Sequence, residues 1–258
     1  MQISPLRIVS REDLTNLIEL TEYIEIVERA FKAYAEGDSF GTDMIHGDTP
    51  GDIEFHIKAG GLSLDGEKYY ALKINASSFS NWSRYNLPNI MGAIILFDAE
   101  KGLPLAILDS IEPTTKRTGA GTAVALKYLA RPDSKVVTIC GCGTQGRIQL
   151  ESIRQVCSVE RVFAYDQEAE ITKKYAEEMN EKLPVSVEAV TDLEGACLKS
   201  DIVVTCTPSR EPYLQQNFIK QGTTIAAIGA DSPDKQEIDS NLLVYIILKF
   251  ILFVEQPY

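Results

Sequence analysis

A glycine-rich turn between a strand and a helix constrains this chain more than any other segment. Residues 135–146 read Lys-Val-Val-Thr-Ile-Cys-Gly-Cys-Gly-Thr-Gln-Gly, so an apolar, β-branched run leads into three glycines at the spacing G-x-G-x-x-G. Residues 147–156 then carry apolar side chains at helical spacing. The segment therefore predicts a strand over 135–140, a tight turn and a helix.

The three glycines have separate roles if the turn binds a dinucleotide. Gly141 allows the sharp turn, Gly143 leaves room for a pyrophosphate, and Gly146 lets the helix pack closely on the strand. The same spacing also fits a purely structural turn. A cofactor is favoured because the next predicted strand, 161–166, ends in Asp166, about 20 residues on, where such folds place the carboxylate that binds the ribose. Gln167 follows without an adjacent arginine, which favours NAD, with NADP as the alternative.

Composition excludes several classes of function. The net charge of −12 and the pI of about 4.7 argue against a nucleic-acid partner, which would need a basic surface. The cysteines number five and form no Cys-x-x-Cys pair, which predicts reduced thiols in a cytoplasmic protein and no metal site. The N-terminus lacks a signal-peptide pattern, and the apolar tail at 244–258 is too short to span a membrane.

The first part of the chain, 1–112, reads as an α+β domain. It has a strand at 6–9, a helix opened by a capping box at Ser10, and a longer helix from Thr21 with Ile24, Val27, Phe31 and Tyr34 on one face and Gly37 at its end. A polar loop is expected over 38–51, strands over 52–58 and 69–74, a loop over 75–88, and a hairpin of strands over 90–97 and 104–108.

The second part, 113–243, alternates strands and helices. Strands are predicted over 135–140, 161–166, 184–190, 201–207 and 223–229, which indicates a mostly parallel sheet wrapped by helices. The predicted fold class is therefore α/β, a Rossmann-type parallel-sheet domain preceded by the α+β domain. Ligands bind at the carboxyl ends of such strands, here at residues 206–209 and 229–235.

Charged residues in unusual settings are candidates for binding. Lys73 interrupts an apolar strand, where a lysine needs a partner charge or a ligand. Lys116 and Arg117 lie near the start of a helix predicted over 114–130, where basic residues oppose the helix dipole and suggest a bound anion. A surface arginine is the alternative for Arg117. His56, which shares a strand face with Lys58, is interpreted as solvent-facing.

These features together resemble the ornithine cyclodeaminase/μ-crystallin family over residues 6–243. The resemblance rests on Lys73, the run Thr115-Lys-Arg-Thr118, the glycine turn with Thr144-Gln145, and Gly229-Ala-Asp231 followed by Lys235. It implies a homodimer whose subunit joins a substrate-binding and dimerisation domain (1–112) to an NAD-binding domain (113–243). It also implies that Lys73 binds the substrate carboxylate, that Arg117 lies between substrate and nicotinamide, and that Asp231 is the catalytic acid/base. The implied cofactor contacts are Asn89, Arg117, Thr144, Gln145, Asp166, Thr207, Ile228, Gly229, Ala230, Asp231 and Lys235.

The family resemblance implies cyclodeamination: hydride abstraction from the α-carbon of an amino acid, imine formation and loss of ammonia. The alternatives are an NAD(P)H-dependent ketimine reductase acting on a cyclic imine, an alanine-type amino-acid dehydrogenase, or a non-catalytic crystallin-type binder or inactive truncated product. Two departures bear on the choice. Residues 41–46 lack the arginine that binds the carboxylate of ornithine, so Lys58 is expected to serve instead. The atypical tail at 244–258 replaces the longer C-terminal part of the family fold, which is expected to be missing.

Overall fold

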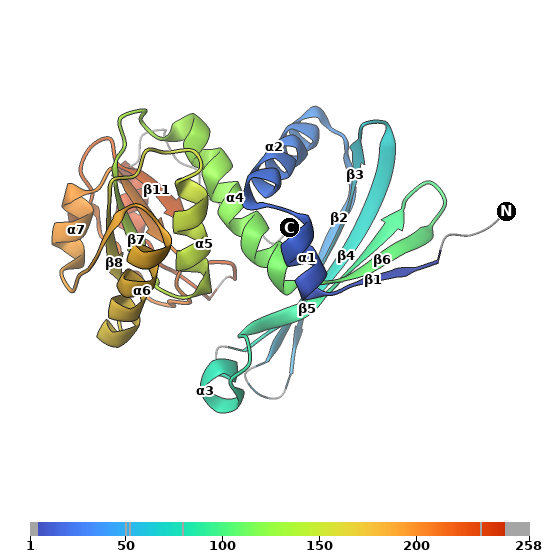
Figure 1. Ribbon diagram of the computed structural model, residues 1–258, viewed down its shortest axis with the longest axis horizontal. Helices are drawn as coiled ribbons and strands as arrows, with labels where there is room; N and C mark the ends of the chain where they lie inside the picture. Colours follow the sequence, from blue (N-terminus) through green and yellow to red (C-terminus); the bar gives the residue numbers. More distant parts are fainter. Residues whose placement is uncertain (1–4, 50, 52, 79, 233, 246–258) are drawn as a thin grey trace. The chain divides into compact units, whose positions relative to one another are not determined.

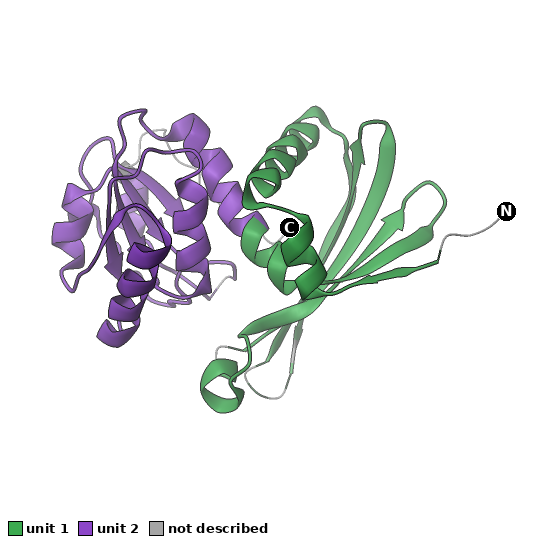
Figure 2. Ribbon diagram, viewed as in Figure 1, with its two compact units in different colours: residues 1–116, 258 green, residues 117–257 purple. Residues whose placement is uncertain are grey.

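The structure of the chain is a computed structural model (Figure 1), and it describes residues 5–49, 51, 53–78, 80–232 and 234–245. These residues form two compact units, coloured separately in Figure 2. The first unit ends at Lys116 and the second begins at Arg117, inside one continuous helix, α4 (Ile111–Leu129). The sequence predicts the boundary at 112/113, near the start of that helix. Of the predicted apolar tail, residues 246–258 lie outside the described residues.

The first unit is built on a six-stranded sheet in the order β1-β6-β5-β4-β3-β2. Neighbouring strands are antiparallel except β1 and β6, which run parallel. The strands are β1 (Arg7–Val9), β2 (Ser39–Asp48), β3 (Glu54–Leu64), β4 (Glu67–Ser77), β5 (Ile90–Asp98) and β6 (Leu103–Asp109), and the helices before α4 are α1 (Arg11–Leu17), α2 (Leu20–Glu36) and α3 (Asn81–Tyr85).

Strand β2 corrects the prediction of a polar loop over 38–51. It pairs only with β3 and forms one edge of the sheet. Polar residues and irregular pairing are common at sheet edges, and the register shifts between Phe40 and Asp43. The predicted end of the next strand was also wrong, since β3 continues through Gly61 to Leu64. A Cβ atom on Gly61 would lie 2.1 Å from the Phe40 ring, so this glycine makes room for an aromatic side chain.

The helix ends of the first unit follow the sequence signals. Ser10 and Asp13 form the predicted capping box at the start of α1. Gly37 ends α2 in the left-handed region, with φ of 87°. The predicted buried face of α2 is wrong in part: Ile24 is buried, but Tyr34 is 63% exposed. The region predicted as a loop over 75–88 contains the end of β4 and the short helix α3.

The second unit contains the predicted parallel sheet, in the order β11-β10-β7-β8-β9, and every neighbouring pair is parallel. One apolar cluster joins the sheet to Leu150 of α5 and Tyr175 of α6, and a second joins it to Cys197 of α7 and Leu242 of α8. Helices therefore cover both faces of the sheet. The elements are β7 (Val136–Cys140), α5 (Thr144–Ile153), β8 (Arg161–Tyr165), α6 (Ala169–Lys182), β9 (Ser186–Ala189), α7 (Leu193–Lys199), β10 (Ile202–Thr205), a 3₁₀ turn η1 (Gln216–Phe218), β11 (Thr224–Ala227) and α8 (Ser240–Tyr245).

Candidate functional site

The glycine turn has the geometry that its spacing predicts. Gly141 follows β7 with φ of 103°, a conformation that L side chains rarely adopt. A Cβ atom on Gly146 would lie 2.1 Å from the carbonyl oxygen of Gly141, so the start of α5 packs directly on the turn. A Cβ atom on Gly143 would meet nothing within 4 Å. The turn is therefore tight on its inner side and open at its second glycine, which fits a dinucleotide pyrophosphate.

The N-terminus of α5 faces this open side. Its N-cap is Gly143, and no side chain caps the helix. The first N–H groups of a helix have no partner within the helix and attract anions such as phosphate. Thr144 and Gln145 form the first turn, and the buried Oε1 atom of Gln145 has no hydrogen-bond partner in the described part of the chain.

Arg147 supports the turn, a role that sequence reasoning missed. Its guanidinium donates hydrogen bonds to the carbonyl oxygens of Cys142 at 2.5 Å and Gly143 at 3.1 Å. The same guanidinium pairs with Glu178 of α6 and lies over the Tyr175 ring, 5.3 Å from its centre. The signal available in the sequence was its position directly after the last glycine of the motif.

Asp166 follows β8 as predicted, and its carboxylate binds the turn itself. Oδ2 accepts the backbone N–H of Cys142 at 2.9 Å, and Oδ1 accepts that of Glu168 at 3.3 Å. The thiol of Cys142 lies beneath the turn, where burial, with the Asp166 charge, raises its pKa to about 12. All five cysteines are free thiols. Cys142 is therefore a protonated packing group at neutral pH.

The ends of β10 and β11 carry the second group of predicted residues. They lie at the carboxyl edge of the sheet with the glycine turn, because all five strands are parallel. A Cβ atom on Gly141 would lie 3.0 Å from the Thr207 methyl group, which shows how close the two segments are. After β11, the Asp231 carboxylate contacts the Lys235 ammonium at 2.5 Å. The Lys235 side chain is 10% exposed, whereas Asp231 is 36% exposed and accessible to a ligand.

A buried glutamate lies beneath these strand ends and was not singled out from the sequence. Glu237 is 1% exposed and accepts hydrogen bonds from Thr205, Thr207, Tyr213 and Gly229. Glu237 lies in a polar segment after β11, and no local sequence pattern there predicts that it is buried. Its burial depends on groups that come from strands earlier in the chain.

In the first unit, Lys58 of β3 and Lys73 of β4 are directly opposite each other in the antiparallel register. Side chains in such pairs point to the same face, about 4.5–5.5 Å apart at Cβ. The next pair on this face is His56 with Asn75, and Asn75 donates to the Thr114 hydroxyl of α4 at 3.3 Å. Both lysines are half-buried. The face therefore carries two cations in one row.

His56 is not fully solvent-facing, which corrects its interpretation. Its side chain is 15% exposed, Nε2 lies 3.4 Å from the Glu54 carboxylate, and its ring meets that of His46 edge-on, with the ring centres 4.7 Å apart. Asn89 belongs to the same unit. Its side-chain oxygen accepts the backbone N–H of Trp82 at 3.1 Å, so it holds the start of α3.

Helix α4 begins at Ile111, three residues before its predicted start, which weakens the argument for an anion there. Lys116 and Arg117 consequently lie in the second turn. Lys116 pairs with Glu112 at 3.1 Å and donates to the carbonyl oxygen of Ile18 at 3.1 Å, so the anion interpretation is wrong for this lysine. Arg117 is half-buried.

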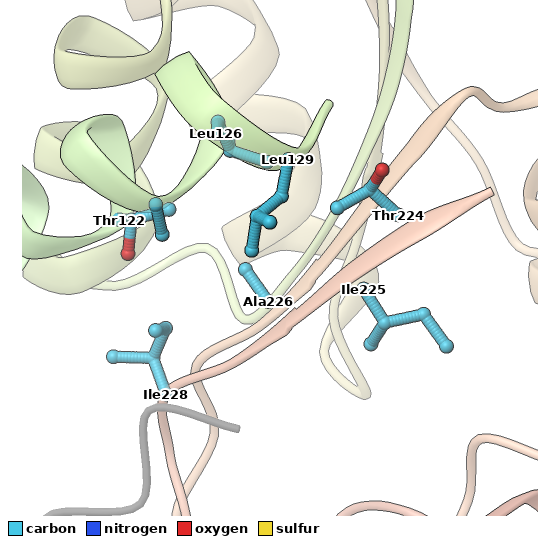
Figure 3. Close-up of a pocket in the computed structure, with 8 residues that line it drawn as sticks. Thr122, Leu126, Leu129, Thr224, Ile225, Ala226 and Ile228 are labelled. Atoms are coloured by element: carbon cyan, nitrogen blue, oxygen red, sulfur yellow. The ribbon is translucent and has the colours of Figure 1, made fainter. Parts of the chain in front are cut away.

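A small cavity between α4 and β11 is too small to be a binding site. Its apolar lining includes Leu126, Ala226 and Ile228 (Figure 3), and its volume is about 10 Å³. A volume of that size holds about one water molecule. Ile228 thus packs towards α4, next to the strand end at Gly229.

In the described residues no helix is both long and apolar enough to cross a membrane. No set of three or more His, Cys, Asp or Glu side chains there could hold a metal ion.

Comparisons with known proteins agree with the fold. A model of the ornithine cyclodeaminase/mu-crystallin family matches residues 6–257. An alanine dehydrogenase of Archaeoglobus fulgidus is 36% identical over 240 residues, which cover 92% of this chain and 70% of that relative. The structure of Thermococcus litoralis Δ1-pyrroline-2-carboxylate reductase in complex with NADH and L-proline has a TM-score of 0.87 at 34% identity, covering 92% of this chain and 73% of that one.

An archaeal alanine dehydrogenase dimer with bound NAD has a TM-score of 0.86 at 35% identity, covering 93% of this chain and 72% of that one. These matches confirm the predicted α/β fold class and agree with the prediction of NAD as cofactor. Because the family model spans nearly the whole chain, the protein belongs to the ornithine cyclodeaminase/mu-crystallin family.

Proposed function

We propose that this chain is an NAD-dependent oxidoreductase that interconverts an α-amino acid and its imine, as an amino-acid dehydrogenase or ketimine reductase. The observation that carries the proposal is Asp231, a partly exposed carboxylate held by Lys235 at the same sheet edge as the glycine turn. A titratable group at the carboxyl edge of a dinucleotide-binding sheet is well placed for proton transfer to a substrate.

The proposed chemistry divides between cofactor and protein. The nicotinamide supplies the acceptor or donor of a hydride at the α-carbon. In the oxidative direction, Asp231 accepts a proton from the substrate amine as the C–N bond becomes C=N. In the reductive direction, the same carboxyl group returns that proton to nitrogen. Lys235 orients the Asp231 carboxylate through their 2.5 Å ion pair.

Lys58 and Lys73 are proposed to bind the substrate carboxylate. Their ammonium groups extend from one face of the sheet at opposite positions in the register, an arrangement that favours an anionic group of the substrate. The pair also bears on the choice of substrate. A cyclodeaminase substrate carries a second amine on its side chain, and this cationic amine is repelled by the two lysines. A substrate with a neutral or acidic side chain meets no such repulsion. This supports the net oxidoreductase over cyclodeamination, which remains the second candidate.

The accessible apolar face of the first sheet supports the proposal of a homodimer. On this face lie Ile8, Phe40, Ile45 and Phe55, which are 81%, 37%, 57% and 38% exposed, and we call it the apolar sheet face. Their positions in the register place them on the side of the sheet opposite Lys58 and Lys73. Phe40, Ile45 and Phe55 lie on the neighbouring strands β2 and β3, and Ile8 lies on β1 at the other edge of the sheet. Exposed apolar side chains gathered on one sheet face favour an interaction surface.

A spectrophotometric assay separates the candidates. The purified protein is incubated with NAD and L-alanine or another α-amino acid, and in parallel with NADH and a cyclic imine. Net formation or consumption of NADH supports the oxidoreductase. Conversion of ornithine to proline without net NADH change supports the cyclodeaminase instead, and NADH binding without any turnover supports the non-catalytic binder.

The role of Asp231 is tested by Asp231→Asn, which keeps the shape and removes the proton acceptor. We expect kcat to fall by about 10²–10⁴-fold while the Kd for NADH stays within about threefold, because general acid–base catalysis contributes that range. The matched control is Asp234→Asn, an exposed carboxylate three residues on. Turnover that is unchanged in Asp231→Asn would remove Asp231 from the mechanism.

A further inference from the structure

The buried carboxylate of Glu237 accepts five hydrogen bonds and has no part in the proposed mechanism. Oε1 accepts the Thr207 N–H at 2.7 Å, the Thr207 hydroxyl at 2.7 Å and the Tyr213 hydroxyl at 3.0 Å. Oε2 accepts the Thr205 hydroxyl at 2.8 Å and the Gly229 N–H at 2.9 Å. Each oxygen therefore faces one backbone N–H and at least one hydroxyl.

The donors come from different segments, so the carboxylate joins them. Thr205 ends β10, Thr207 and Tyr213 lie in the loop after it, and Gly229 follows β11. The backbone of Glu237 is fixed as well, because its carbonyl oxygen accepts the N–H groups of Tyr213 and Leu214, both at 3.0 Å. One side chain thus fixes the carboxyl ends of two neighbouring strands to one loop.

The packing around Gly229 shows how closely these segments approach. A Cβ atom there would lie 2.2 Å from the Thr207 carbonyl oxygen and 2.6 Å from Glu237 Oε1. Only glycine fits without moving backbone. The position of Gly229, and of the chain that continues from it to Asp231, is consequently set by contact with Thr207 and Glu237.

The uncharged character of the donors fits a positioning role. Every donor to Glu237 named above is a hydroxyl or a backbone N–H. Burial, with the neighbouring Cys140 and Glu237, raises the pKa of the Tyr213 phenol well above its usual value, so Tyr213 remains a hydroxyl donor. Burying a carboxylate is costly even when it is hydrogen-bonded, and in this protein the cost is offset by the hydrogen bonds from the Thr207 and Gly229 N–H groups and from three hydroxyls.

We propose that Glu237 is a positioning residue that fixes Thr207 and the segment from Gly229 to Asp231 for cofactor binding and proton transfer. This inference rests on the proposed function, because those segments are its cofactor-binding and catalytic edge. Glu237 acts only through the groups it holds.

The variant that tests the inference is Glu237→Gln, which preserves size. A glutamine has one carbonyl oxygen and one NH₂ group. Whichever way the amide is turned, its NH₂ faces either the Thr207 N–H or the Gly229 N–H, and two donors repel. We expect the Kd for NADH to rise by about tenfold, which corresponds to the net free energy of about one hydrogen bond lost from the support of Thr207 and Gly229, and kcat to fall as Asp231 shifts. Hydrogen exchange at the Thr207 and Gly229 amides should become faster.

The matched control is Thr138→Val, which breaks a buried hydroxyl pair with Ser200, 2.7 Å apart, elsewhere in the same sheet. It should lower Tm without changing the Kd for NADH or the exchange of the Thr207 and Gly229 amides. If Glu237→Gln does not fold, Tyr213→Phe removes one donor from the same carboxylate and should give a smaller change in the same direction.

The measurements distinguish failure of the inference about Glu237 from failure of the proposed function. If the wild-type protein binds no NADH, the proposed function is contradicted. Hydrogen exchange at the Thr207 and Gly229 amides then still tests whether Glu237 positions these segments. Wild-type Kd, kcat and amide exchange in Glu237→Gln, or in Tyr213→Phe where that variant replaces it, would overturn the inference. Equal changes in Thr138→Val and Glu237→Gln would also overturn it, since they would reflect stability alone.

Discussion

Two glycine-to-alanine substitutions in the same turn should separate cofactor binding from stability. Gly143→Ala adds a methyl group where nothing lies within 4 Å, at a residue whose φ is −81°. Gly146→Ala adds the same group 2.1 Å from the Gly141 carbonyl oxygen. We expect the first variant to fold normally and lose affinity for NADH, and the second to lose stability.

The magnitudes follow from the local geometry. At Gly146 the backbone must move by more than 1 Å to reach an ordinary contact distance, and such overpacking costs about 1–3 kcal/mol. The better helix propensity of alanine offsets at most about 1 kcal/mol of that. A net loss of about 1–2 kcal/mol corresponds to a fall in Tm of about 2–8 °C for a chain of this size. At Gly143, the lower unfolded-state entropy of alanine roughly cancels its poorer N-capping, so Tm should change by less than about 2 °C.

The assays are thermal unfolding followed by circular dichroism and titration with NADH followed by fluorescence. Gly143→Ala should raise the Kd for NADH by about tenfold or more, because its methyl group occupies the space proposed for the pyrophosphate. A wild-type Kd in this variant would refute the assignment of the turn as the phosphate site. A normal Tm in Gly146→Ala would refute the close packing of α5 on the turn.

Two further predictions concern stability and assembly. Asp201 accepts the Lys135 and Val136 N–H groups and pairs with Arg131 at 2.7 Å, and although burial opposes it, these contacts lower its pKa below 3.8. The stability that Asp201 contributes is therefore present above pH 3.8 and is lost as pH falls through the lowered pKa. In urea unfolding, Asp201→Asn should lower the free energy of unfolding by about 1–3 kcal/mol near neutral pH and by much less in acid. A difference that does not change with pH would contradict this. Ile45→Asp, on the apolar sheet face, should convert a dimer to a monomer in light scattering, whereas Ile171→Asp, at a 38% exposed site in α6, should not.

The parallel sheet and its turn were predictable because their signals are local. Apart from β9, which reads Ser-Val-Glu-Ala, the strands of the second unit are short, mostly apolar runs, and the roles of Gly141 and Gly146 follow from spacing alone. The carboxylate after β8 was predictable for the same reason, since the fold fixes where the second strand ends. The roles of Lys58, Lys73 and Arg117 stay predictions, and that of Asp231 is tested by the Asp231→Asn variant.

The features that sequence reasoning missed depend on distant partners. Strand β2 is polar and contains glycine, so only its pairing with β3 makes it a strand. Glu237 receives hydrogen bonds from residues up to 32 positions away, and no local periodicity reports such contacts. The start of α4 was misjudged by three residues, because the segment before Thr114 contains a proline, which also fits the first turn of a helix.

The bonds between Asp166 and the backbone have a consequence for coenzyme engineering. A common route to NADP use is to replace the ribose-binding acid with a small or basic residue, which relieves repulsion of the 2′-phosphate. In this chain that exchange would also remove the acceptor for the Cys142 N–H, 2.9 Å away. A redesigned enzyme would then lose affinity for both coenzymes. Asparagine, which keeps an oxygen at that position without the charge, is therefore the better first substitution.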